Sequence, residues 1–198
     1  MKKIMFNDKY GLTDAVLKGK KTMTRRIIPC KVCQDVLTPM RYNGSDVSHN
    51  SMAMKHAHYK IGEKVAIAQS YHNLNKSGFV APEWLEHVCE SSAGYENKMF
   101  VRADLMPYCI RITDIKVERL QDISEEDCLR EGIQEYFPYI DRNPNDRVRT
   151  FQYFRDGKIR HRMSPAPECF ALLIDDICGN GTWKRNPWVF VYSFELIK

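Results

Sequence analysis

The chain has 198 residues, of which 43% are hydrophobic and 28% charged, and its formal net charge is +5. This composition excludes a disordered chain, and no apolar run approaches the roughly 18 residues that a membrane helix needs. The first residues lack the apolar stretch of a signal peptide, so we expect a single cytoplasmic domain, 1–198, without a membrane partner. The seven cysteines are then expected to be reduced thiols.

Positive charge is concentrated near the amino terminus. The first 31 residues contain nine Lys or Arg against two acidic residues, and the remainder of the chain is close to neutral. Such a basic segment predicts an anionic partner, either nucleic acid or a phosphorylated small molecule. The densest part is LKGKKTMTRR (17–26), with five cations around two threonines. An exposed turn, a phosphate-binding segment and a threonine nucleophile activated by lysine all fit this pattern.

The first third of the chain predicts short elements separated by a long insertion. Residues 3–6 are typical of a strand, and the segment from Asp8 to Gly19 favours a short helix with a partial apolar face. Residues 27–60 show little periodicity and are interpreted as an insertion. Within KIGEKVAIAQSY (60–71) we expect a strand with Val65 and Ile67 on one face, and 72–105 is again irregular.

The clearest strand signal is CIRITDIKVERL (109–120), and it contains a change of phase. Ile110 and Ile112 share one parity, whereas Ile115 and Val117 have the other. Because side chains alternate along a strand, this pattern predicts a bulge or bend at Thr113 and Asp114. Bends of this kind allow a small sheet to close into a barrel.

Two helices and a final strand are predicted after this point. Ser124 caps a helix that ends at Gly132, and Ser164 followed by proline begins a longer one that ends at Gly179. The longer helix has apolar residues at i, i+3, i+4 and i+7, which are Phe170, Leu173, Ile174 and Ile177. The segment NPWVFVYSFELIK (186–198) is apolar on both parities and predicts a strand buried on both faces.

Residues 135–163 are aromatic and basic without a firm pattern. Within them, 147–162 contains six Lys or Arg residues, one histidine and three aromatic residues, which fits either a second nucleic-acid surface or an exposed amphipathic loop. Short strands separated by single helices favour an α+β protein with a small, mostly antiparallel sheet or barrel.

Four segments together resemble a known family. In order they are LKGKKTMTRR, IGEKVAIAQSY, ITDIKVERLQDISEEDCLREGI and TWKRNPWVFVYSFEL, and they cover about half of the chain. This combination resembles the ASCH domain of the PUA-like superfamily, in particular the longer ASCH proteins of bacteria and phages. The resemblance implies a PUA-like β-barrel with flanking helices, a cleft at the basic motif, and insertions at about 27–60, 72–105 and 135–163. It also implies RNA binding, because the family is generally thought to bind RNA.

One short bacterial branch of the family acts as an amidohydrolase on N4-acetylcytidine. Its catalytic residues correspond to Lys21, Thr24 and Glu131, so the resemblance implies a threonine nucleophile, a lysine base and a carboxylate acid or base. A lysine with a lowered pKa can activate a hydroxyl, which makes these roles chemically reasonable. In a regular strand Lys21 and Thr24 would face opposite sides. The assignment therefore requires Lys21 to lie in the corner between Gly19 and the strand.

A binding module is the other main hypothesis. Arg25 and Arg26 can grip phosphates, threonine hydroxyls can donate hydrogen bonds, and an aromatic side chain can stack on a base. The predicted ligand-binding residues are Lys20, Thr22, Arg25, Arg26, Gln69 and Tyr71. We expect RNA, a nucleotide or a nucleoside as the ligand, and no cofactor.

Cysteines and histidines supply one further candidate site. The residue types of Cys30, Cys33, His56 and His58 can bind zinc. Their spacing is loose, however, and favours two reduced thiols in a loop over a metal site. The remaining thiols with apolar neighbours are expected to be core residues; they are Cys109, Cys128, Cys169 and Cys178.

Overall fold

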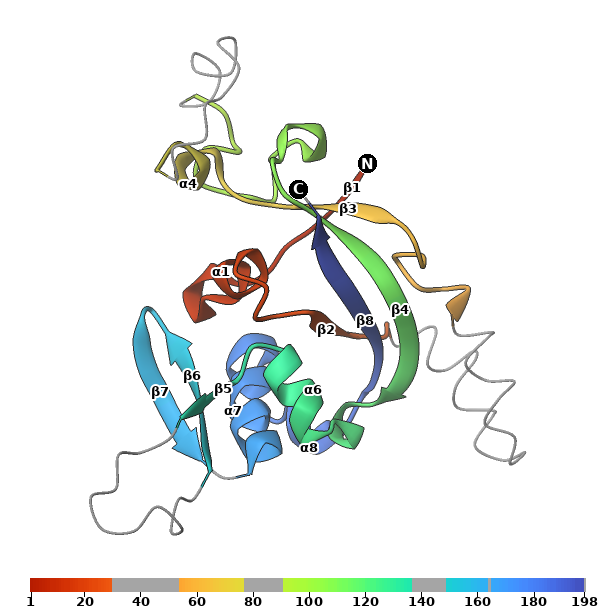
Figure 1. Ribbon diagram of the computed structural model, residues 1–198, viewed down its shortest axis with the longest axis vertical. Coiled ribbons are helices and arrows are strands. Elements are labelled where there is room, and N and C mark those ends of the chain that lie inside the picture. The colour runs from red at the N-terminus through yellow and green to blue at the C-terminus, as the bar shows by residue number, and fades with distance from the viewer. Residues whose placement is uncertain (30–53, 77–90, 137–148, 164, 198) are drawn as a thin grey trace.

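The computed structural model describes residues 1–29, 54–76, 91–136, 149–163 and 165–197, which form an α+β protein with two sheets (Figure 1). The main sheet has five strands, with only its first pair parallel. In spatial order they are β1 (Lys2–Ile4), β3 (Lys64–Ile67), β4 (Cys109–Arg119), β8 (Trp188–Ile197) and β2 (Met23–Ile27). The small sheet is antiparallel and contains β5 (Gln134–Tyr136), β6 (Thr150–Arg155) and β7 (Lys158–Met163). The α+β prediction is thus confirmed.

The main sheet is open within the described part of the chain. Its edge strands are β1 and β2, and no ladder of backbone hydrogen bonds joins them in the described residues. They are linked instead by one side chain, because Arg26 of β2 donates a hydrogen bond from Nη2 to the carbonyl oxygen of Met5, 2.7 Å away and just after β1. The closed barrel that we expected is therefore not confirmed.

The centre of the main sheet follows the sequence pattern closely. The pairing of β4 with β8 shifts register between Ile112 and Asp114, which confirms the predicted bulge. β8 lies between β4 and β2, and its residues from Val189 to Phe194 are buried on both faces, as expected from their apolar character. This strand contributes five residues to the hydrophobic core and pairs with β2, which carries part of the amino-terminal motif.

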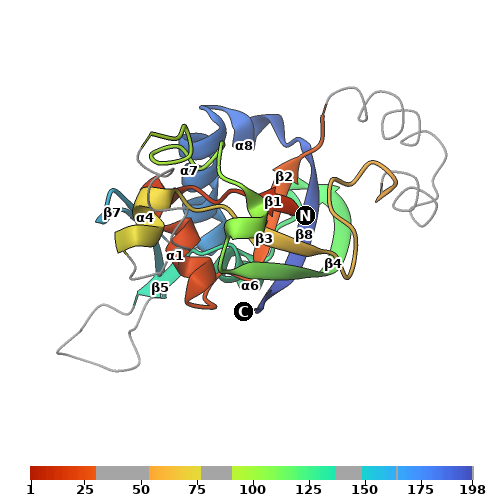
Figure 2. The same ribbon diagram turned by 90° about the horizontal axis from the view of Figure 1, so that it is seen from above.

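Three helices pack beside the sheets: α6 (Glu125–Arg130), α7 (Ala166–Cys178) and α8 (Thr182–Arg185). The Ser124 side chain caps α6 by accepting a hydrogen bond from the amide of Asp127, and α7 is capped at its carboxyl end by Gly179, both as predicted. Ser164, the expected cap of α7, lies outside the described residues. In Figures 1 and 2 the small sheet lies beside α7, on the side of the molecule opposite β4.

The remaining described elements are short. They include the helices α1 (Leu12–Leu17) and α4 (Tyr71–Lys76), together with the 3-10 turns η1 (Asp8–Tyr10), η4 (Ala103–Leu105) and η5 (Leu120–Asp122). No helix in the described ranges is long and apolar enough to cross a membrane.

Part of the predicted insertion at 135–163 is regular structure. β6 and β7 form a hairpin whose two-residue turn, Asp156 and Gly157, has φ of 53° and 73°. Positive φ at both positions is typical of a type I′ turn, and Asp-Gly is a strong sequence signal for it. Phe151 and Tyr153 are buried in the hydrophobic core, so the interpretation of 147–162 as an exposed loop was wrong for the described residues.

Candidate functional site

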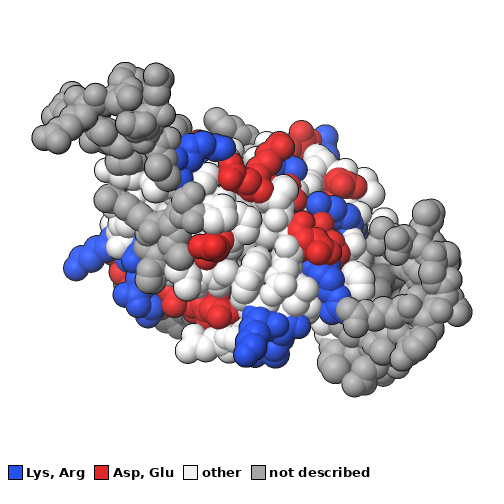
Figure 3. Space-filling model, turned by 90° about the horizontal axis from the view of Figure 1, so that it is seen from below, with Lys and Arg blue, Asp and Glu red and all other residues white. Residues whose placement is uncertain are grey.

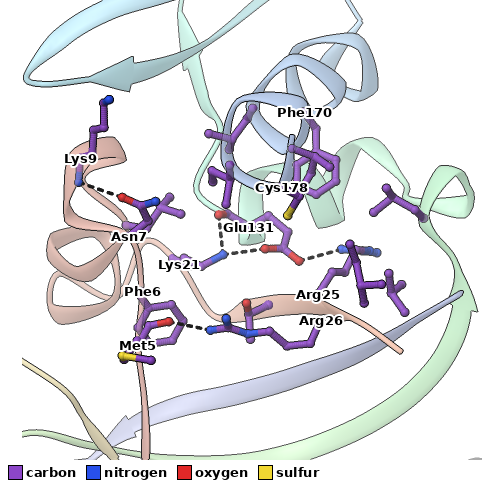
Figure 4. A pocket seen from close by; sticks show the side chains of 18 of the residues that line it. Met5, Phe6, Asn7, Lys9, Lys21, Arg25, Arg26, Glu131, Phe170 and Cys178 are labelled. Carbon is purple, nitrogen blue, oxygen red and sulfur yellow. Dashed lines mark hydrogen bonds and ion pairs between the residues drawn. The ribbon is translucent and has the colours of Figure 1, made fainter. Parts of the chain in front are cut away.

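A cavity of about 650 Å³ lies between the two edges of the main sheet (Figure 4). The segment after β1 contributes Met5 and Phe6, and β2 contributes the four residues from Thr24 to Ile27. Lys21, Glu131 and one face of α7 also line it. Four residues of the basic motif therefore line a concave site: Lys21, Thr24, Arg25 and Arg26.

One wall of the cavity is apolar. It consists of the α7 residues that the sequence pattern placed on one helical face: Phe170, Leu173, Ile174 and Ile177. The first two are buried, and the last two are only half-buried because the cavity lies in front of them. A wall of this kind can pack against a nucleobase or an acyl group.

Lys21 reaches the cavity because it precedes β2. The chain turns at Gly19, where φ is 69°, and the amides of Lys20 and Lys21 both donate hydrogen bonds to the carbonyl oxygen of Ala15. Lys21 and Thr24 therefore line the same cavity although they are three residues apart. This is the corner arrangement that the catalytic assignment requires.

Lys21 and Glu131 form a buried pair. Their side chains are 3% and 6% exposed, and Lys21 Nζ lies 2.6 Å from Glu131 Oε2 and 2.6 Å from the carbonyl oxygen of Glu131. Glu131 is positioned at the end of α6, just before Gly132. Burial lowers the pKa of Lys21 below its ordinary value, against the opposing effect of the Glu131 carboxylate. Because its pKa is lowered, Lys21 can transfer a proton to Glu131 more readily than a solvated lysine could.

Arg25 is bound on three sides by carboxylates. Its Nη2 lies 2.6 Å from Glu118 of β4 and 2.8 Å from Asp127 of α6, and its Nη1 lies 3.2 Å from Glu131. The Arg25 side chain is only 1% exposed. Burial alone would lower the pKa of Arg25, but the three carboxylates outweigh burial and raise it. Arg25 is thus a structural cation, in contrast to the phosphate-gripping role that we expected.

Lys116 extends this charged cluster toward the surface. Its Nζ lies 2.9 Å from Glu118 and 3.2 Å from Asp127. Burial would raise the pKa of Asp127, but hydrogen bonds and charges from Arg25 and Lys116 lower it instead. This charged cluster consists of Lys21, Arg25, Lys116, Glu118, Asp127 and Glu131.

Thr24 and Arg26 differ from Arg25 in their surroundings. Both line the cavity; Thr24 is 5% exposed, whereas Arg26 is an exposed residue. The Thr24 hydroxyl makes no hydrogen bond to a residue that the structure describes, so it is available to a ligand. Figure 4 shows Arg26 extending below Lys21 to Met5.

The other predicted ligand-binding residues do not line the cavity. Lys20 is exposed, and the Thr22 hydroxyl accepts a hydrogen bond from Arg130 Nε at 3.4 Å. Gln69 lies between β3 and α4, and Tyr71 is the first residue of α4. The Tyr71 ring belongs to a second hydrophobic cluster, and its hydroxyl accepts a hydrogen bond from the amide of Arg102. The structure does not bring these four residues together with Lys21, Thr24 and Glu131.

The zinc hypothesis receives no support from the described residues. Cys30 and Cys33 lie outside them, and His56 and His58 are exposed. No group of three or more His, Cys, Asp or Glu that could hold a metal occurs within the described ranges.

Three of the four thiols expected in the core are buried there: Cys109, Cys128 and Cys169. Burial raises the pKa of Cys128 and of Cys169 to about 12, which keeps both thiols protonated at neutral pH. The expectation was wrong for Cys178, which is exposed and lines the cavity at the end of α7.

Sequence reasoning missed the carboxylates of the charged cluster other than Glu131. Glu118 and Asp127 come from a strand and a helix that are distant in sequence from Arg25, and each has an ordinary interpretation as a surface residue. In comparisons with known proteins, no family model, no curated protein and no solved structure matches this chain.

Proposed function

We propose that this chain is an ASCH protein with a PUA-like fold and that its cavity binds a modified nucleoside. The observation that carries the proposal is that Lys21, Thr24 and Glu131 line one cavity opposite an apolar wall. A volume of about 650 Å³ is in the range of small-molecule sites. The wall can cover the base and its substituent, while the hydroxyl and the ammonium supply polar contacts.

An extended RNA-binding groove has less support than a pocket for one nucleoside. Arg25 is neutralised by carboxylates and cannot grip a phosphate. On the face shown in Figure 3, Lys and Arg side chains are interspersed with Asp and Glu rather than gathered in one basic patch. A continuous basic surface is what non-specific binding of a nucleic-acid backbone requires.

Amide hydrolysis is a second candidate, and the buried pair of Lys21 and Glu131 favours it. In this reaction Thr24 Oγ1 attacks the carbonyl carbon of the N4-acyl group while the neutral Lys21 amine takes the hydroxyl proton. The C–N bond then breaks and the leaving amine receives a proton, with Glu131 as the acid or the relay. Water hydrolyses the threonine ester, so N4-acetylcytidine and water would give cytidine and acetate.

The binding proposal predicts that N4-acetylcytidine binds to the cavity. We expect a Kd below about 1 mM in titration calorimetry with the Thr24→Ala variant, in which the ligand stays intact. Ile177→Asp should weaken binding at least about tenfold, because it places a carboxylate in the apolar wall. Ile159→Asp is the matched control, since Ile159 is 43% exposed on β7 and does not line the cavity. Equal affinities of these two variants would contradict the proposed site.

The hydrolase candidate predicts that the wild-type protein releases cytidine from N4-acetylcytidine. Thr24→Ala should reduce the rate by about 10³-fold or more, because no other hydroxyl replaces the nucleophile. Thr22→Ala is the control, since this threonine lies two residues earlier and outside the cavity. Chromatographic separation of cytidine from the substrate measures both rates. If the protein binds N4-acetylcytidine but releases no cytidine, the hydrolase candidate is wrong and the cavity is a binding site only.

A further inference from the structure

We infer that the ligand of this cavity carries a phosphate and that Arg26 binds it. The inference rests on the proposed function and specifies the class of ligand. It depends on the charge balance of the cavity, on the surroundings of Arg26, and on the contrast between Arg26 and Arg25.

The charges that line the cavity are not balanced. Five cations and two carboxylates contribute to it: Lys9, Lys21, Arg25, Arg26 and Lys98, with Asp8 and Glu131. Lys21 pairs with Glu131, Arg25 is neutralised by Glu131 together with two carboxylates outside the lining, and Lys98 pairs with Asp8 at 2.8 Å. Neither Lys9 nor Arg26 has a carboxylate within 4.0 Å in the described part of the chain. An anionic ligand would supply the missing negative charge.

Arg26 is the one of these two cations that faces the proposed site. The ammonium of Lys9 points away from the pair of Lys21 and Glu131 in Figure 4, whereas Arg26 crosses below Lys21. Arg26 and Thr24 are two residues apart on β2, so they lie on the same face of the strand, roughly 6.5 Å apart along its axis. A group bound by Arg26 would therefore belong to the same molecule as a group that contacts Thr24.

The guanidinium of Arg26 is held in place with donors to spare. Nη2 donates to the carbonyl oxygen of Met5 at 2.7 Å, and Cζ lies 5.9 Å from the centre of the Phe6 ring. Nε and Nη1 have no partner among the described residues. Nη2 also carries a second N–H, which lies beside either the Nε–H or an Nη1–H and can form with it the planar fork that binds a phosphate through two parallel hydrogen bonds.

A permanent anion fits this position better than a transient oxyanion. Donors that stabilise the charge of a tetrahedral intermediate act most strongly where water is excluded. Arg26 is an exposed residue at the mouth of the cavity, unlike the buried Lys21 and Arg25. The phosphate could be the monoester of a nucleotide or a diester of an RNA strand, since both present the same oxygen atoms to Arg26.

The test compares three probes with the Thr24→Ala variant: N4-acetylcytidine, its 5′-monophosphate, and a single-stranded RNA trinucleotide with N4-acetylcytidine in the middle. We expect the monophosphate or the trinucleotide to bind about tenfold more tightly than the nucleoside in titration calorimetry. A larger gain for the monophosphate identifies a nucleotide ligand, and a larger gain for the trinucleotide identifies a backbone phosphate.

Arg26→Gln, in the same background, should abolish this gain and leave the affinity for the nucleoside unchanged. Lys20→Gln should keep the gain, because it removes one positive charge from the same segment but lies outside the cavity. Equal affinity for the nucleoside and both phosphorylated probes would overturn the inference and leave the proposed function intact. Equal weakening of all probes by Arg26→Gln would also overturn it. Absence of binding by all three probes would overturn the proposed function together with the inference.

Discussion

Replacing Arg25 by methionine is expected to lower the free energy of unfolding by about 3 to 5 kcal/mol. The guanidinium is buried and neutralises Glu118, Asp127 and Glu131 at 2.6 to 3.2 Å. Without it, these carboxylates would repel one another in a site that water reaches poorly. Lys21, Lys116 and Arg130 would remain as their cationic partners among the described residues. Urea denaturation followed by circular dichroism measures the loss.

The neighbouring residue provides a matched control for this prediction. Arg26→Met removes the same charged group from the next position of β2, but Arg26 is exposed and has no carboxylate partner in the described residues. Its effect on the free energy of unfolding should stay below about 1.5 kcal/mol, because it removes one exposed hydrogen bond to the carbonyl oxygen of Met5. Similar losses in the two variants would show that the charged cluster does not exist as described.

Glu131→Gln is expected to destabilise the protein by about 3 to 5 kcal/mol at neutral pH, and the loss should become smaller as pH rises. The substitution leaves Lys21 buried without a carboxylate. Burial already lowers the pKa of Lys21 below its ordinary value of 10.5, and losing Glu131 lowers it further. Between the folded-state pKa and 10.5, the unfolded chain then holds more protons than the folded chain, so the free energy of unfolding must increase with pH.

The double variant Lys21→Met with Glu131→Gln removes the titrating group. Its stability should lie within about 1 kcal/mol of the wild-type value, because a neutral pair of similar volume replaces a buried ion pair. Its free energy of unfolding should lack the increase with pH that the titration of Lys21 gives to Glu131→Gln. Urea denaturation from about pH 7.5 to about pH 10 compares the three proteins. Equal slopes for the single and the double variant would mean that Lys21 is not the group that titrates.

The charged cluster also explains how the site can be held in place. Glu118 from β4 and Asp127 from α6 fix the Arg25 side chain, and Arg25 in turn contacts the Glu131 carboxylate that holds Lys21. Strand, helix and amino-terminal motif are thus joined by hydrogen bonds between charged groups, which are stronger than those between neutral groups. We expect this arrangement to hold the side chains of Lys21 and Glu131 in a fixed position relative to Thr24.

Much of the local structure follows from the sequence. The corner at Gly19, the bulge near Thr113, the cap at Ser124 and the doubly buried final strand were all predicted, because each depends on residues that are adjacent along the chain. The Asp-Gly turn at 156–157 has a sequence signal of the same kind, although we interpreted that region as irregular.

Only the tertiary structure decided what the cations of the motif do. Arg25 and Arg26 are adjacent and chemically identical, yet one is buried among three carboxylates and the other lies exposed at the mouth of a cavity. Likewise, the apolar face of α7 was predictable, but its position as a cavity wall was not. Local propensities depend on neighbouring residues, whereas the environment of a charge depends on which distant segments pack against it, and the sequence pattern alone does not specify those contacts.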